Sequence, residues 1–198
     1  MKKKANELLL ALILTVTLIV SVGLTVTPVL AQPTEVWVDD DWAGSSPGDP
    51  VDGHIFGTDA FATIQNGIAA VATGGTVHVA AGTYNEQVWI DKTLTLLGAK
   101  HGEDARTRDG TGESVIDWSW GPVQIAADNV VLDGFTIQGS IYGDPGFIAG
   151  IWGNPGYSGT HGGQQILNNI VQNNIIGLSL GNDGTYQTII RFNLFQYN

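Results

Sequence analysis

Residues 75–98 read GTVHVAAGTYNEQVWIDKTLTLLG and contain three short segments in which apolar and polar side chains alternate. The apolar members are Val77 and Val79, Val88 and Ile90, and Leu94 and Leu96. A period of two places alternate side chains on the same face, so each segment is predicted to be a short β-strand with one buried face. A similar triplet, Val123-Gln124-Ile125, follows downstream.

Similar segments recur along the chain at fixed offsets. Residues 169–174 match 193–198 at an offset of 24, 94–98 match 130–134 at 36, and 134–135 match 169–170 at 35. The two larger steps each contain an irregular insertion, 99–113 and 142–163. Without them the repeat is a little over twenty residues long and holds several strands, which predicts one coil of a β-solenoid.

Stacked coils bury inward Val, Ile, Leu and Phe side chains in one long core. The repeat also places Asn169 over Asn193 and Asn174 over Asn198, so we interpret these amides as structural ladders at the turns.

One helix is predicted over residues 58–71, capped by Asp59 and ended by Gly74-Gly75. Its apolar face is formed by Phe61, Ile64, Ile68 and Val71. We expect it to cap the N-terminal end of the core.

The segments 75–86 and 88–98, with Val36-Trp37-Val38 and 61–65 before them, resemble the opening of right-handed parallel β-helix proteins of the pectin-lyase-like superfamily, in its surface-protein branch. The resemblance spans about residues 35–198. It implies an all-β fold, a right-handed parallel β-helix with a short N-terminal capping helix. It implies little about activity, because that fold carries lyases, esterases, hydrolases and non-catalytic stalks.

The catalytic motifs of those enzymes do not carry over. The stretch Val88-Trp89-Ile90-Asp91 resembles part of a pectate lyase motif, but Lys92 stands where that motif has His. The esterase and hydrolase classes need paired carboxylates on the coils, and Asp39, Asp40 and Asp41 precede the predicted solenoid. No catalytic residue is therefore assigned, and we lean against an enzyme.

Composition narrows the partners. The chain has 198 residues, a net charge of −11 and no cysteine, which excludes disulfides and thiol chemistry and disfavours nucleic acid as a partner.

The N-terminus is predicted to be a secretory signal, residues 1–31. Lys2, Lys3 and Lys4 precede an apolar run over 8–26, and Val29 and Ala31 are the small residues that a signal peptidase requires. An uncleaved membrane anchor is the alternative, because the run approaches the length of a membrane-spanning helix. Cleavage after Ala31 gives a mature chain with 5 basic and 18 acidic side chains, a net charge of −13, and no membrane span. We divide the remainder into a lead-in with the capping helix, 32–75, and coils, 76–198.

Candidate ligand sites are of two kinds. Asp39, Asp40 and Asp41 could hold calcium, the one cofactor considered, although a solvated acidic loop explains them as well. Aromatic side chains near strand ends and in Gly-rich insertions could stack on sugars or could instead pack on the solenoid wall. They are Trp118, Trp120, Trp152, Tyr142 and Tyr157.

The four histidines carry no metal-ligand spacing, so we interpret His78 as an isolated surface residue.

The expected function is that of an exported parallel β-helix module, non-catalytic and associated with the cell surface or with a polysaccharide. The alternative is the N-terminal part of a polysaccharide lyase, esterase or glycoside hydrolase whose active site lies beyond residue 198. The chain ends within a repeat, so we expect an open last coil, with Phe192, Leu194 and Phe195, to favour self-association.

Cleavage of the predicted signal can be checked directly. Mass spectrometry of exported material should show a chain that starts at Gln32, because the basic start, apolar run and small-residue site occur in the required order. A full-length product retained in the membrane would contradict this prediction.

Overall fold

The computed structural model describes residues 31–142, 149–153 and 160–198. The predicted signal peptide lies outside the described residues except for Ala31, and Tyr157 lies outside them as well.

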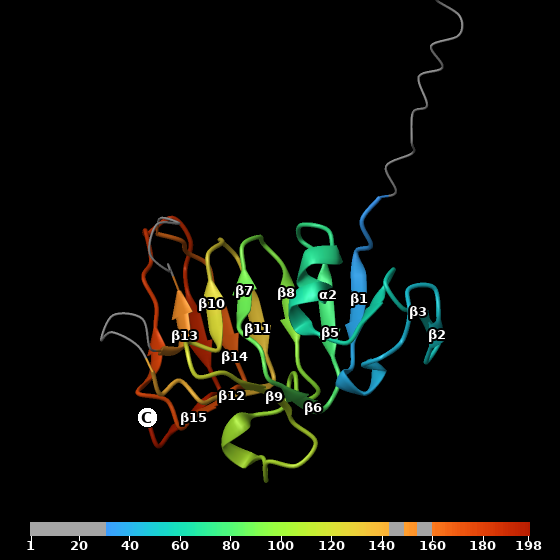
Figure 1. The fold of residues 1–198 in the computed structure, drawn as a ribbon. Coiled ribbons are helices and arrows are strands. Elements are labelled where there is room, and N and C mark those ends of the chain that lie inside the picture. The colour runs from blue at the N-terminus through green and yellow to red at the C-terminus, as the bar shows by residue number, and fades with distance from the viewer. Residues whose placement is uncertain (1–30, 143–148, 154–159) are drawn as a thin grey trace, which may run out of the picture. The chain divides into compact units, whose positions relative to one another are not determined.

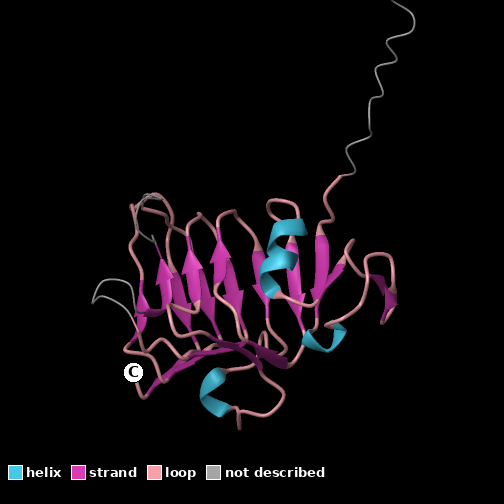
Figure 2. Ribbon diagram, viewed as in Figure 1, coloured by secondary structure: helices cyan, strands magenta, loops and turns pink. Residues whose placement is uncertain are grey.

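Most of the described chain forms three parallel sheets (Figures 1 and 2). The seven-stranded sheet has the spatial order β17 (Ile189–Arg191), β14 (Gln165–Leu167), β11 (Val131–Asp133), β8 (Thr95–Leu97), β5 (Thr76–Val79), β1 (Glu35–Val38) and β4 (Ala60–Phe61). The five-stranded sheet has β18 (Leu194–Gln196), β15 (Ile170–Gln172), β12 (Phe135–Gln138), β9 (Ser114–Asp117) and β6 (Gly82–Tyr84). The four-stranded sheet has β16 (Ile176–Ser179), β13 (Ala149–Gly153), β10 (Val123–Ile125) and β7 (Val88–Ile90).

From β5 onward the chain visits these three sheets in turn, so each strand pairs with the third strand after it. The described chain is therefore an all-β fold of stacked parallel strands, consistent with a β-solenoid. A short antiparallel pair, β2 (Pro50–Val51) and β3 (His54–Ile55), lies in the lead-in, where β1 continues the seven-stranded sheet.

The register confirms two of the three predicted offsets. Leu96 pairs with Leu132 at 36, and Ile170 pairs with Leu194 at 24. The predicted offset of 35 is wrong, because Thr136 pairs with Ile170 at 34. The two turns correspond at Gly134 and Asn168, whose φ angles of 86° and 52° both lie in the left-handed region. The alignment had matched Gly134 to the following Asn instead.

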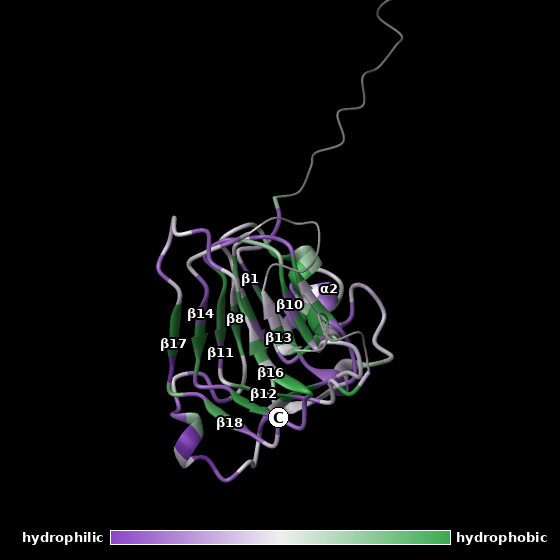
Figure 3. Cartoon of the chain, turned by 90° about the vertical axis from the view of Figure 1, so that its left-hand side faces the viewer, coloured by the Kyte–Doolittle hydropathy of each residue, from purple (hydrophilic) through white to green (hydrophobic). Residues whose placement is uncertain are grey.

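Inward side chains stack in columns through the core. One column, in the seven-stranded sheet, consists of fully buried Val36, Val77, Leu96, Leu132 and Ile166. Strands coloured as hydrophobic enclose this interior in Figure 3, and hydrophilic segments lie mainly in the connecting turns. The alternation read from the sequence is therefore the alternation between core and solvent.

The predicted helix is shorter than expected. Helix α2 spans Ile64–Ala70 and is capped by Thr63, whose side chain accepts a hydrogen bond from Asn66 N–H. Asp59 is not the cap. Its carboxylate accepts from Ile55 N–H, and the following Ala60–Phe61 pair with β1 instead of joining the helix.

Helix α2 contacts β1, β4, β5 and β7, and its Ile64 and Ile68 are buried in the same core. At Gly67 a Cβ atom would lie 2.7 Å from Val38 Cγ2, so glycine permits this close packing. No helix among the described residues is long and apolar enough to cross a membrane.

The two predicted insertions differ. Residues 99–113 connect β8 to β9 and contain a single 3₁₀ turn, Ala105–Thr107. The segment 142–163 is not wholly irregular, because it contains β13, the third strand of its coil. The small residues Ala149, Gly150 and Gly153 hid this strand from the apolar pattern.

The predicted asparagine ladders are present. Asn193 Oδ1 accepts hydrogen bonds from Asn169 N–H and Nδ2, at 2.8 and 3.3 Å. Asn198 Oδ1 accepts from the same two groups of Asn174, at 3.2 and 3.1 Å. Fully buried Asn169 also donates to Leu132 O and accepts from Phe135 N–H, so it links three coils.

Asn169→Ala should lower the free energy of unfolding by about 2–4 kcal/mol, because it leaves buried backbone groups of Leu132 and Phe135 without partners. Urea denaturation measures this. The control Asn85→Ala, at an exposed position, should change it by less than about 0.5 kcal/mol. Equal stabilities of the two variants would contradict the structural role of the ladder.

Candidate functional site

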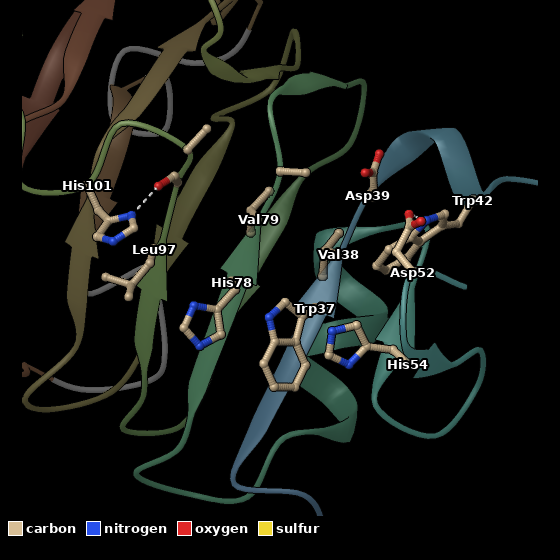
Figure 4. A pocket seen from close by; sticks show the side chains of 13 residues that line it. Trp37, Val38, Asp39, Trp42, Asp52, His54, His78, Val79, Leu97 and His101 are labelled. Atoms are coloured by element: carbon tan, nitrogen blue, oxygen red, sulfur yellow. Dashed lines mark hydrogen bonds between the residues drawn. The ribbon is translucent and has the colours of Figure 1, made fainter. Parts of the chain in front are cut away.

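A cavity of about 290 Å³ opens on the outer face of the seven-stranded sheet, near the carboxyl ends of β1, β5 and β8 (Figure 4). We call it the histidine pocket. It is lined by Trp37, Val38, Asp39, Trp42, Asp52, His54, His78, Val79, Ala80, Leu97, Gly98, Ala99 and His101.

The strand register forms this pocket. Trp37, His78 and Leu97 are paired neighbours on β1, β5 and β8 and form one outward row. Two residues further along, the next outward positions of β5 and β8 hold Ala80 and Ala99, whose small side chains leave the cavity open.

Buried hydroxyl groups fix the wall beneath the cavity. Ser114 Oγ accepts a hydrogen bond from Ala99 N–H at 2.8 Å and lies 2.8 Å from Ala80 O, to which it can donate. Tyr84 OH donates to Ala80 O at 3.1 Å. Because these bonds join β5, β6, β8 and β9, the pocket is preformed.

Three aromatic rings stack along one side of the pocket. The Trp37 ring lies 4.0 Å from the His54 ring and 5.2 Å from the His78 ring, with interplanar angles of 24° and 14°. His54 is held in place by Asp59, 3.1 Å from its Nδ1. Since both faces of Trp37 are covered, the stack presents ring edges and imidazole nitrogens to a ligand.

Carboxylates form the opposite end. Trp42 Nε1 donates to Asp52 Oδ2 at 2.9 Å. Burial and the negative charges of Asp41, Asp40 and Asp52 raise the pKa of Asp39, although a hydrogen bond from Asp41 N–H opposes this.

The histidines favour neutral forms that can accept hydrogen bonds. His101 Nδ1 lies 2.8 Å from Gly98 O, so this nitrogen carries the proton and Nε2 is an acceptor. Burial lowers the pKa of His78, and the charges of His101 and His54 lower it further, against the effect of Glu35. With Asp39 and Asp52, these groups suit a small ligand that donates hydrogen bonds.

The interpretation of His78 as isolated is therefore wrong, since three of the four histidines line one pocket. Sequence analysis also missed Trp37, Trp42 and His101. One signal was available: Val36-Trp37-Val38 and Val77-His78-Val79 are equivalent triplets. No spacing in the sequence brings His54, Trp42 or His101 to them.

The acidic run lies at the edge of this pocket. Side-chain oxygens of Asp39, Asp40 and Asp41 lie within 4.8 Å of one another, and no other such acidic or histidine group occurs within 31–142, 149–153 and 160–198. Asp40 Oδ2 already accepts from Thr83 N–H at 3.0 Å. The group could supply three of the roughly six to eight oxygen ligands of calcium.

The predicted aromatic residues lie elsewhere. Trp118, Trp120 and Tyr142 occupy the turns that lead from the five-stranded to the four-stranded sheet on adjacent coils, and 40%, 56% and 60% of their surfaces are exposed. We call them the aromatic ledge. Trp152 is partly buried on β13, where its register partner on β10 is Gln124, itself paired with Trp89.

Backbone hydrogen bonds bring the ledge together. Ser119 O, between the two tryptophans, accepts from Ile141 N–H at 3.2 Å and from Tyr142 N–H at 3.0 Å. Gly121 N–H donates to Ser140 Oγ at 3.3 Å. Side chains more than twenty residues apart thus share one exposed edge.

No protein-family model, curated protein or solved structure that was compared with the chain matches it.

The lowered pKa of His78 has a consequence for stability. The unfolded state binds its proton more readily than the folded state, so stability should rise as pH rises through the interval just below 6.5. NMR titration of the His78 ring should give a midpoint below 6.5, and His78→Phe should flatten the stability profile there. His161→Gln is the control, because His161 lies outside the pocket and should leave that slope in place. A His78 midpoint at or above 6.5 would contradict this prediction.

Proposed function

We propose that the chain is a right-handed parallel β-helix of the pectin-lyase type, exported to the cell surface or medium, that binds a neutral glycan without cleaving it. Three features support the fold. Strands recur in every third position, asparagine ladders stack at the turns, and parallel crossovers are almost always right-handed.

The observation that carries the binding proposal is the aromatic ledge. Monomeric proteins rarely gather exposed aromatic side chains without a partner. Trp118, Trp120 and Tyr142 are exposed on two adjacent turns that hydrogen bonds hold in place. Aromatic surfaces of this kind can pack against the apolar face of a sugar.

Charge selects among sugars. The chain has a net charge of −11, which disfavours uronates and other acidic glycans. Calcium bound at Asp39–Asp41 would reduce this repulsion locally, and its binding is a separate proposal.

Alanine substitution of the ledge tests the function. In a tryptophan fluorescence titration with neutral and acidic oligosaccharides, neutral chains should bind, and Trp120→Ala should weaken binding by about 5–10-fold, the loss of roughly 1 kcal/mol of stacking. Trp118→Ala should act in the same direction. Trp152→Ala, away from the ledge on β13, should have a smaller effect.

Tyr197→Ala is a matched control, since Tyr197 is an exposed aromatic residue outside the ledge. Binding that is unchanged in both ledge variants, or turnover of pectate to unsaturated products, would contradict the proposal.

A further inference from the structure

The outer face of the five-stranded sheet carries a second polar surface that the proposed function does not use. Gln138, Gln172 and Gln196 occupy paired positions on β12, β15 and β18, in line with Asp117 on β9. Gln196 Nε2 donates to Gln172 Oε1 at 2.7 Å, Gln172 Nε2 to Gln138 Oε1 at 3.0 Å, and Gln138 Nε2 to Asp117 Oδ2 at 2.9 Å. These residues form a continuous amide ladder along the direction in which the coils stack.

The ladder uses only part of each amide. A primary amide has two N–H donors and an oxygen with two lone pairs. Gln138 and Gln172 each spend one donor and one acceptor on the ladder, so one of each is left for a ligand. Each amide is a lining residue of a groove of about 360 Å³.

A parallel apolar row completes the floor of this groove. Val115 and Ile170 both pair with Thr136, and Leu194 pairs with Ile170, so the four side chains form a row two residues from the amides. The floor thus has an apolar strip beside a polar strip. A pyranose ring has the same division, between its C–H face and its hydroxyl edge.

The wall of the groove is fixed by a buried ion pair. Arg108 Nε lies 3.3 Å from Glu113 Oε1, and both side chains are almost fully buried. Arg108 also donates to Lys100 O and Phe135 O, and Glu113 Oε2 accepts from Thr136 Oγ1. Since this pair neutralises itself, the remaining charge in the lining is the carboxylate of Asp109.

We propose that this groove binds a neutral, extended β-linked glycan that runs across the strands, about one sugar unit per coil. Strands in a sheet are about 4.8 Å apart, which is close to the length of one sugar unit in an extended β-1,4 chain. Successive amides would therefore meet successive sugars. The acidic lining disfavours uronates, and a coiled α-linked chain would leave the line of amides. The inference takes its ligand class from the proposed function but uses a different surface.

The test is an NMR titration of the ¹⁵N-labelled chain with cellohexaose, observing side-chain amide and indole signals separately. The NH₂ signals of Gln138, Gln172 and Gln196 should shift. Affinity should rise from cellobiose to cellotetraose and then level off, because the ladder offers three amides. Gln172→Leu should weaken binding about 10-fold, as expected for the loss of one or two hydrogen bonds. The matched control Gln165→Leu, on β14 of the seven-stranded sheet, should not.

The outcomes separate the two proposals. Shifts of the Trp118 and Trp120 indoles without shifts of the three amides would overturn the groove and retain the ledge. Amide shifts without indole shifts would support the groove and overturn the ledge. No shift of either kind would overturn both. Equal binding of maltohexaose, or a folded Gln172→Leu variant with unchanged affinity, would also overturn the groove. If Gln172→Leu does not fold, the amide shifts and chain-length series of the unaltered chain decide.

Discussion

Parallel pairing between successive coils is the constraint on which this structure depends. Three sheets must each advance by one strand spacing per coil, so any insertion has to return the chain to the same register. The paired offsets vary from 19 between Val77 and Leu96 to 36 between Leu96 and Leu132, yet the inward column stays apolar and buried. Variation in length is absorbed by the turns, and the core remains continuous.

The same constraint governs polar side chains. A residue that recurs at one position of the coil stands directly above its counterpart, about 4.8 Å away. At buried turns this produces asparagine ladders that satisfy backbone groups, as Asn169 does for Leu132 and Phe135. On an outer face it produces the glutamine ladder, whose spare donors and acceptors face a groove. Identical geometry thus gives a structural role inside and a binding surface outside.

Sequence alone could predict what depends on local pattern. Alternation identified the strands around Val77, Val88 and Leu96, and the repeated Asn pairs identified the ladders. The helix start was wrong because Asp59, a good capping residue, bonds to Ile55 and leads into a strand beside β1. That competition involves tertiary pairing, which a local pattern does not show.

The histidine pocket could not be predicted for a related reason. Trp37 and His78 become neighbours through a pairing of 41 residues, and His78 and Leu97 through one of 19, so no single period relates them. Trp42, His54 and His101 come from connecting segments whose course is set by the sheet they cover. Unequal insertions therefore hide outward sites more than they hide the core, since the core needs only an apolar residue at each step. An outward site needs particular side chains in particular coils, and it appears only when the register of each coil is known.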